Sequence, residues 1–77
     1  MDKEKTIITI SKDHRLKIEF DNKNNIINIF GNSNGLKYLG EVCLELSKEK
    51  SFEHWHLSYE FYTLTEGSIE TIIHHTK

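Results

Sequence analysis

Apolar residues gather in short segments along the chain, and their spacing predicts β-strands separated by polar turns. Alternation is clearest in residues 16–20, where one apolar face is expected to be buried. Residues 26–30 are apolar on both faces except at Asn28, which favours a central strand covered by a helix on one side and partly covered on the other. The full set of predicted strands is residues 6–10, 16–20, 26–30, 54–57 and 69–74. Residues 59–64 are aromatic but irregular, and they fit either an edge strand or a loop.

Residues 34–50 have the periodicity of an amphipathic helix. The apolar side chains that recur there at intervals of three and four, and that are expected to face the sheet, are Leu36, Leu39, Val42, Cys43 and Leu46. Asn32 or Ser33 is expected to cap the start of the helix. Gly40 lies within the apolar stripe, where it is expected to allow close approach of helix and sheet. The pattern places on the opposite, solvent side Lys37, Glu41, Glu45, Lys48 and Glu49.

Together these elements predict a single α+β domain that covers residues 1–77. We expect an antiparallel sheet of four to five strands with the amphipathic helix packed on one face, in the order β-β-β-α-β-β. A chain of 77 residues buries only about 60% of the surface that its unfolded form exposes. Small domains of this kind gain stability by pairing with themselves or with a partner. The size therefore favours a binding role over an enclosed active site.

Charge narrows the partners that such a domain can have. Twelve acidic residues against ten basic ones give a formal net charge of −2, and Arg15 is the only arginine. Both features argue against a nucleic-acid binder. Residues 1–5 carry charges of both signs and lead into only five strand-like residues, so we expect neither a signal peptide nor a membrane span. Cys43 is the only cysteine and excludes an internal disulfide, so we expect a cytoplasmic protein in a reducing compartment.

Two histidines form the first candidate site. His54 and His56 are two residues apart on a predicted strand, so their side chains project from one face about 7 Å apart. Two imidazoles placed this way can share a zinc ion, but a catalytic site needs a third ligand and a structural site needs a fourth. The candidates for the third ligand are His74, His75, His14, Glu53 and Glu70. No local spacing fixes any of them, and ordinary half-exposed strand residues explain the pair as well, so we predict no metal and no cofactor.

Catalytic chemistry finds little support in the sequence. Cys43 is the one candidate nucleophile, but it lies in the apolar stripe, where a buried thiol behaves as a small hydrophobic side chain. Gly31 and Gly35 flank the start of the helix without the Gly-Lys-Ser/Thr of a phosphate-binding loop. The pair His74 and His75 is interpreted as a solvated chain end. We therefore predict that the protein is not an enzyme.

Two other surfaces are candidates for contact with a partner. Glu41, Glu45 and Glu49 form an acidic ridge on the solvent side of the helix, which is either a solvated face or a surface that meets a basic protein. Aromatic residues cluster between positions 55 and 62, and tryptophan and tyrosine are common among binding hot spots. Trp55 is assigned to the core, whereas Tyr59 and Tyr62 fit either the core or a contact surface.

The chain resembles the immunity protein 32 family of bacterial polymorphic-toxin systems. The resemblance rests on residues 31–39 (GNSNGLKYL), 54–57 (HWHL) and 64–70 (LTEGSIE), in that order and spacing. It implies a small α+β protein that binds and neutralises a co-encoded toxin in the cytoplasm of the producing cell, without catalysis. The sequence departs from the family in the aromatic residues 59–62 and in the additional N-terminal strand.

Three hypotheses follow. The first is a toxin-neutralising immunity protein that acts by steric occlusion, whose cognate toxin would be contacted through Glu41, Glu45, Glu49, His54, His56 and Tyr59. The second is a small metal-binding module built on His54 and His56. The third is a homodimeric structural domain in which sheet edges pair across a two-fold axis.

Overall fold

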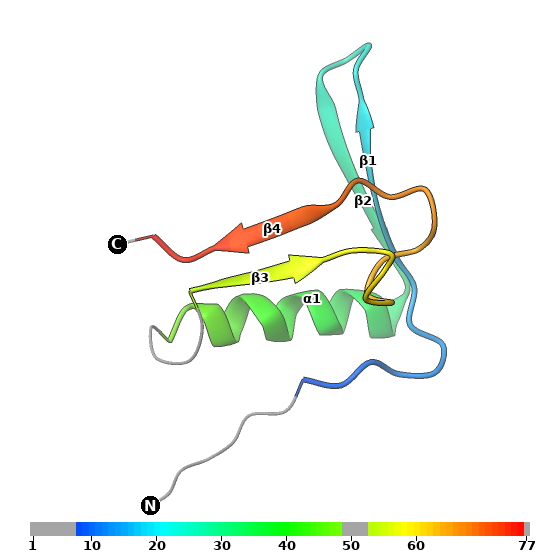
Figure 1. Cartoon of the computed structure of the whole chain (residues 1–77). Coiled ribbons are helices and arrows are strands. Elements are labelled where there is room, and N and C mark those ends of the chain that lie inside the picture. Colours follow the sequence, from blue (N-terminus) through cyan, green and yellow to red (C-terminus); the bar gives the residue numbers. More distant parts are fainter. Residues whose placement is uncertain (1–7, 49–52, 77) are drawn as a thin grey trace, which may run out of the picture.

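Four strands and one helix make up the described part of the chain, which in this computed structural model is residues 8–48 and 53–76. In order, the elements are β1 (Leu16–Asp21), β2 (Ile26–Gly31), α1 (Ser33–Leu46), β3 (His54–Leu57) and β4 (Thr71–His74) (Figure 1). The α+β class is confirmed. The predicted first strand, residues 6–10, is wrong over residues 8–10, which have no regular structure, and its first two residues lie outside the described ones.

β1 and β2 form an antiparallel hairpin that rises away from the helix (Figure 1). The Asp21 carboxylate fixes the turn between them by accepting hydrogen bonds from the backbone N–H groups of Lys23 and Asn24, and from the Asn24 side chain at 2.9 Å. These bonds, first of all the one from the Asn24 side chain, hold the pKa of Asp21 below its usual value. Asn25 completes the turn with φ at 59°, a left-handed conformation that asparagine tolerates.

The strands form two separate two-stranded sheets within the described residues, rather than the expected single sheet of four to five. β3 and β4 are antiparallel and lie along the helix, while the hairpin crosses them near the start of α1 (Figure 1). The turn at residues 65–68 separates the sheets because it occupies the outer edge of β1. Thr65 N–H donates to the Leu16 carbonyl and Ile69 N–H to the Ile18 carbonyl, both at 2.8 Å.

The helix begins and ends on side-chain hydrogen bonds. Asn32 is the N-cap, as one of the two expected candidates, and its Oδ1 accepts from Gly35 N–H at 2.8 Å. The same oxygen accepts from Arg15 N–H at 3.1 Å and thereby joins the helix start to the residue that precedes β1. At the other end, His75 Nδ1–H donates to the carbonyl of Leu46 at 2.6 Å, which satisfies one of the last carbonyls of the helix. The interpretation of His75 as a solvated chain end is therefore wrong.

The face of α1 that packs inward differs from the predicted stripe. The helix residues that are buried are Gly35, Tyr38, Val42, Glu45 and Leu46. Leu36 and Cys43, both expected inside, are exposed. Gly35 sets this orientation, because a Cβ atom there would lie 1.8 Å from the carbonyl oxygen of Arg15. Gly40 meets nothing within 4 Å, so the expectation that it allows close approach is wrong.

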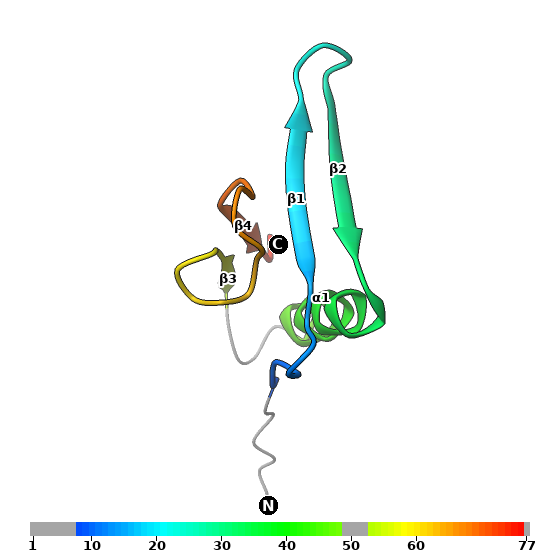
Figure 2. The same ribbon diagram turned by 90° about the vertical axis from the view of Figure 1, so that its right-hand side faces the viewer.

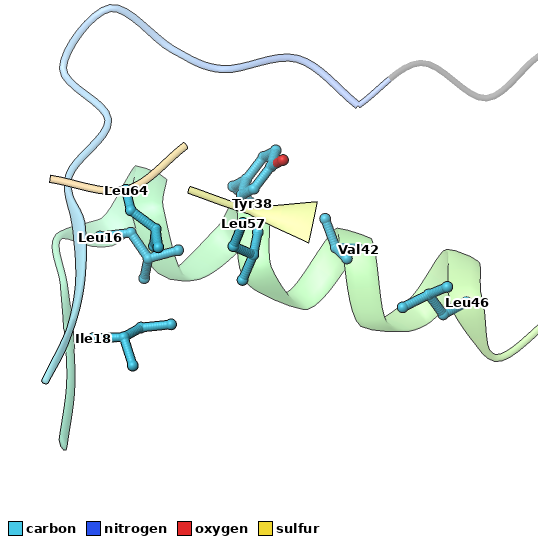
Figure 3. Close-up of a cluster of buried hydrophobic side chains, with 7 residues drawn as sticks. All are labelled: Leu16, Ile18, Tyr38, Val42, Leu46, Leu57 and Leu64. Carbon is cyan, nitrogen blue, oxygen red and sulfur yellow. The ribbon is translucent and has the colours of Figure 1, made fainter. Parts of the chain in front are cut away.

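One hydrophobic cluster joins the elements (Figure 3). Its members come from β1, α1, β3 and the segment before β4, and they are Leu16, Ile18, Tyr38, Val42, Leu46, Leu57 and Leu64. Trp55 packs against this cluster, as the sequence predicts, and its Nε1–H donates to the Tyr38 hydroxyl at 2.9 Å. The core therefore lies where the hairpin, the helix and β3 meet, and it does not extend along the hairpin.

The outer half of the hairpin is exposed. β2 was expected to be a central, covered strand, but Ile26, Ile27, Ile29 and Phe30 are each about half exposed or more, and β2 pairs only with β1. Phe20, which continues the buried face of Leu16 and Ile18, is also exposed. The expected covering fails because α1 lies across the base of the hairpin rather than along the face of β2 (Figure 2).

Tyr38 makes the stability of the fold sensitive to alkaline pH. Burial raises the pKa of its hydroxyl above the usual 10.0, and the hydrogen bond from Trp55 opposes this to a smaller extent. Since the folded state holds this proton more tightly than the unfolded state, the contribution is present below pH 10 and is lost as pH rises through the raised pKa. We expect urea unfolding to show a loss of stability above pH 10 that is smaller in Tyr38→Phe. Because Tyr38→Phe also removes the hydrogen bond from Trp55, its free energy of unfolding at neutral pH should be lower by about 1 kcal/mol. An unchanged alkaline slope in Tyr38→Phe would contradict this account.

Among the described residues, no helix is long and apolar enough to cross a membrane.

Candidate partner-binding surface

A rigid turn connects β3 to the segment before β4, and we refer to residues 58–64 as the aromatic turn. Ser58 and Thr63, both buried, hold it from inside. Ser58 N–H donates to Thr63 Oγ1 at 2.9 Å, and the Ser58 carbonyl accepts from Thr63 N–H, Thr63 Oγ1–H and Leu64 N–H. Ser58 Oγ also accepts from Phe61 N–H at 3.2 Å. Because five hydrogen bonds converge on one serine, the turn has a fixed shape.

This turn presents three large aromatic side chains to solvent. Tyr59 is 53% exposed, Phe61 60% and Tyr62 80%. Tyr62 has φ at 63°, a left-handed conformation that is rare for a bulky residue and that carries backbone strain. Exposed aromatic side chains on a preorganised backbone are typical of binding hot spots, because little conformational entropy is lost when a partner covers them. The choice left open for residues 59–64 is thus settled as a turn rather than a strand.

His54 and His56 lie on the outer face of the β3–β4 sheet and are exposed. The antiparallel register places His74 opposite His54 and Ile72 opposite His56, so these four residues make up what we call the histidine face. The His54 ring lies 5.1 Å from that of His56 and 5.8 Å from that of His74, centroid to centroid. Trp55 points to the opposite side, toward the core.

The histidine face brings together one of the expected third ligands, His74, with the original pair. Nevertheless, within residues 8–48 and 53–76 no group of three or more histidine, cysteine, aspartate or glutamate side chains is arranged to hold a metal ion. The other candidates lie elsewhere: His14 donates from Nε2–H to the Thr63 carbonyl at 2.8 Å, and His75 is engaged with the helix end. The geometry thus gives the metal-binding hypothesis no specific support.

The acidic ridge does not exist as an exposed row. Glu45 is only 7% exposed, and its carboxylate accepts from Lys48 Nζ at 2.8 Å. Glu41 is half-buried, and Glu49 lies outside the described residues. The placement of Glu45 on the solvent side is wrong because the helix is rotated inward at Gly35 and Tyr38. Contact of these three glutamates with a partner stays a prediction.

Cys43 is exposed rather than buried in the apolar stripe. It lines a shallow hollow of about 310 Å³ together with His74 and His75. His75 directs one ring nitrogen at the Leu46 carbonyl, so it serves the end of the helix. Nucleophilic catalysis needs a base aligned with the thiol and a group that orients the base, and the described residues show no hydrogen bond to the Cys43 sulfur.

Sequence reasoning missed parts of this surface. Phe61 was visible only as a member of an irregular aromatic cluster, Tyr62 was left open between the core and a contact surface, and nothing in their spacing indicated a turn held by Ser58 and Thr63. His74 joins the histidine face through the register of β3 with β4, which depends on the length of the connection between them. Tyr59, His54 and His56 were predicted, and all three side chains are exposed.

The described residues form a small α+β domain, and its aromatic turn and histidine face carry the exposed side chains that are candidates for contact with a partner. The chain belongs to the family described as Immunity protein 32, whose sequence model matches residues 26–76, well over half of its length. The match begins at β2 and includes α1, β3, the aromatic turn and β4. No curated protein and no solved structure matches the chain.

Proposed function

We propose that this chain is a non-enzymatic immunity protein that binds and neutralises a co-encoded bacterial toxin in the cytoplasm. Membership of the Immunity protein 32 family carries this proposal. The match covers the elements that bear both the aromatic turn and the histidine face. Neutralisation works by occlusion, in which the immunity protein covers a surface that the toxin needs for its activity.

The aromatic turn is the centre of the proposed interface. Tyr59, Phe61 and Tyr62 supply rigid apolar area, and the tyrosine hydroxyls add hydrogen-bonding groups at its edge. The histidine face lies on β3 and β4, the strands on either side of the segment that contains the aromatic turn, and it extends the proposed interface along them. The carbon atoms of an imidazole ring can pack against apolar groups, and its nitrogen atoms donate or accept hydrogen bonds. Both properties suit the polar rim of a protein–protein interface.

Co-expression with the toxin encoded next to this chain tests the proposal directly. We expect cells that produce the toxin to survive only when the intact chain is present, and the two proteins to co-purify as a complex. A toxin that belongs to a different toxin–immunity pair serves as the control, and the chain should neither bind it nor neutralise it. Failure of the cognate toxin to bind would contradict the proposal, and protection without binding would contradict occlusion.

A further inference from the structure

The outer edge of β2 presents unpaired backbone groups. Asn32 N–H donates to the Arg15 carbonyl at 3.2 Å, which fixes the alternation of the β1–β2 ladder. Hydrogen-bonded pairs alternate with non-hydrogen-bonded pairs along such a ladder. It follows that Ile27 and Ile29 direct their N–H and C=O groups away from β1. In the described part of the chain β2 has no strand on that side.

This edge lacks the features that protect exposed strands. Natural edge strands are guarded by charged residues, prolines or bulges, whereas β2 reads Ile-Ile-Asn-Ile-Phe-Gly. Ile27 is 61% exposed, and Ile26, Ile29 and Phe30 are about half exposed. An edge of this composition gains stability when another strand pairs with it.

The sequence of β2 is complementary to itself in the antiparallel sense. It carries four apolar residues placed symmetrically about Asn28. When two copies pair about a two-fold axis through Asn28, Ile26 faces Phe30 of the second copy and Ile27 faces Ile29. The outward N–H and C=O groups of Ile27 and Ile29 then form two hydrogen-bonded pairs, which leaves no backbone group of this stretch unpaired.

The only polar side chain of the strand falls on the axis of this arrangement. Asn28 meets Asn28 of the other copy at a non-hydrogen-bonded position, where side chains are closest and two amides can exchange hydrogen bonds. No charged residue lies between positions 26 and 31, so the pairing opposes no like charges. A second copy of β2 therefore matches the strand at every position, with apolar residues facing apolar residues and Asn28 facing Asn28.

We propose that two copies of this chain pair along β2 to form a continuous four-stranded antiparallel sheet. The outer edge of β1 is closed to such pairing, because the 65–69 segment is hydrogen-bonded to Leu16 and Ile18. β3, β4 and the aromatic turn lie on that closed side of the hairpin, opposite the free edge of β2 (Figure 2). The dimer therefore leaves the proposed toxin-binding surface uncovered. Its formation does not depend on the toxin, so the two proposals can be tested separately.

Sedimentation velocity with an edge-blocking variant tests the dimer. Ile27→Pro removes the outward N–H together with the isoleucine side chain, but it removes no backbone group that bonds β1, so the hairpin ladder stays intact. We expect the wild type to change from monomer to dimer between roughly 1 and 100 µM, and Ile27→Pro to associate at least tenfold more weakly, since about two hydrogen bonds are lost. Ile27→Thr keeps the N–H and the β-branched shape and serves as the matched control. A wild type that is monomeric at 100 µM overturns the proposal (roughly the upper limit for a weak interface).

Cysteine cross-linking tests the register. In a Cys43→Ser background, Asn28→Cys places two thiols at the axis, where Cα atoms are about 4.5 Å apart and a disulfide can form. Ile26→Cys, the control, faces Phe30 instead, and its thiols are too far apart to join. We expect mild oxidation to cross-link Asn28→Cys and not Ile26→Cys. Equal cross-linking of both variants overturns the register. If the wild type is monomeric and Ile27→Pro no longer binds the toxin, the dimer is overturned and the edge of β2 pairs with a strand of the toxin instead.

Discussion

Replacing Tyr62 with glycine is expected to weaken binding of the toxin and protection against it while leaving the domain folded. Tyr62 is the most exposed aromatic side chain of the turn, and truncation of a hot-spot residue costs about 2 kcal/mol or more, roughly a thirtyfold loss of affinity. Phe61→Ala is expected to act in the same direction. Binding of purified chain to its toxin by calorimetry, together with survival on co-expression, measures both effects.

The choice of glycine separates binding from stability. Tyr62 has a positive φ that glycine adopts without strain, so the relief of strain offsets the greater freedom of the unfolded chain. We expect the free energy of unfolding of Tyr62→Gly to stay within about 1 kcal/mol of the wild type. Phe20→Ala, which removes a half-exposed aromatic ring on the hairpin, is the matched control and should bind the toxin normally. Normal toxin binding by Tyr62→Gly would exclude the aromatic turn from the interface.

Gly35→Ala is expected to destabilise the fold strongly, although it adds only one methyl group to the helix. The new Cβ would lie 1.8 Å from the Arg15 carbonyl oxygen, a backbone atom that cannot rotate away. The first turn of α1 would have to separate from Arg15, and the hydrogen bonds of the Asn32 side chain with the Gly35 and Arg15 N–H groups would be stretched. We expect a loss of about 3 kcal/mol or more, measured by urea unfolding.

Gly40→Ala, in the same helix, is expected to change the stability of the fold in the opposite direction. A Cβ at Gly40 meets nothing within 4 Å, and alanine favours the helical conformation. This substitution should stabilise the domain by about 0.5 to 1 kcal/mol. Equal effects of the two substitutions would mean that α1 does not pack against Arg15 as described.

The amphipathic pattern predicted that a helix exists but misplaced its inward face. Counting aliphatic residues directed Leu36 and Cys43 inward, whereas the structure buries Gly35 and Tyr38. A glycine and a tyrosine contribute little to an aliphatic stripe, yet one allows a close backbone contact and the other fills the core and accepts a hydrogen bond from Trp55. Helix orientation was thus decided by tertiary contacts that periodicity does not contain.

Three of the strands were predicted well individually, whereas the strand expected at residues 6–10 and the assembly of the strands into one sheet were predicted poorly. β1, β2 and β3 begin at the predicted residues, because alternation and turn-forming residues mark them locally. How they join depended on the 65–68 turn, where Ser68 Oγ accepts a hydrogen bond from Ile18 N–H that a strand would otherwise accept. A side chain that replaces one strand carbonyl cannot be recognised before the two segments are known to meet.

The candidate site was predicted in part for the same reason. His54 and His56 follow from a spacing of two on one strand, which is a local property. The placement of Glu45 in an exposed acidic ridge was wrong because it assumed a helix orientation that the structure does not have, whereas contact of the glutamates with a partner stays a prediction. The fixed shape of the aromatic turn rests on Ser58 and Thr63, two small polar residues that carry no signal of their own in the sequence.

The construction of the aromatic turn separates the residues that hold its shape from those that show on its surface. Ser58 and Thr63 fix the backbone from below, while the side chains at positions 59, 61 and 62 take no part in those hydrogen bonds. Under the proposed function, substitutions at these three positions that tolerate the backbone conformation would therefore change the recognised partner while Ser58 and Thr63 keep the shape of the turn. Under the proposed function, a lineage of such proteins follows a changing toxin by substituting these exposed side chains, and grafting the turn onto another family member is expected to exchange their specificities.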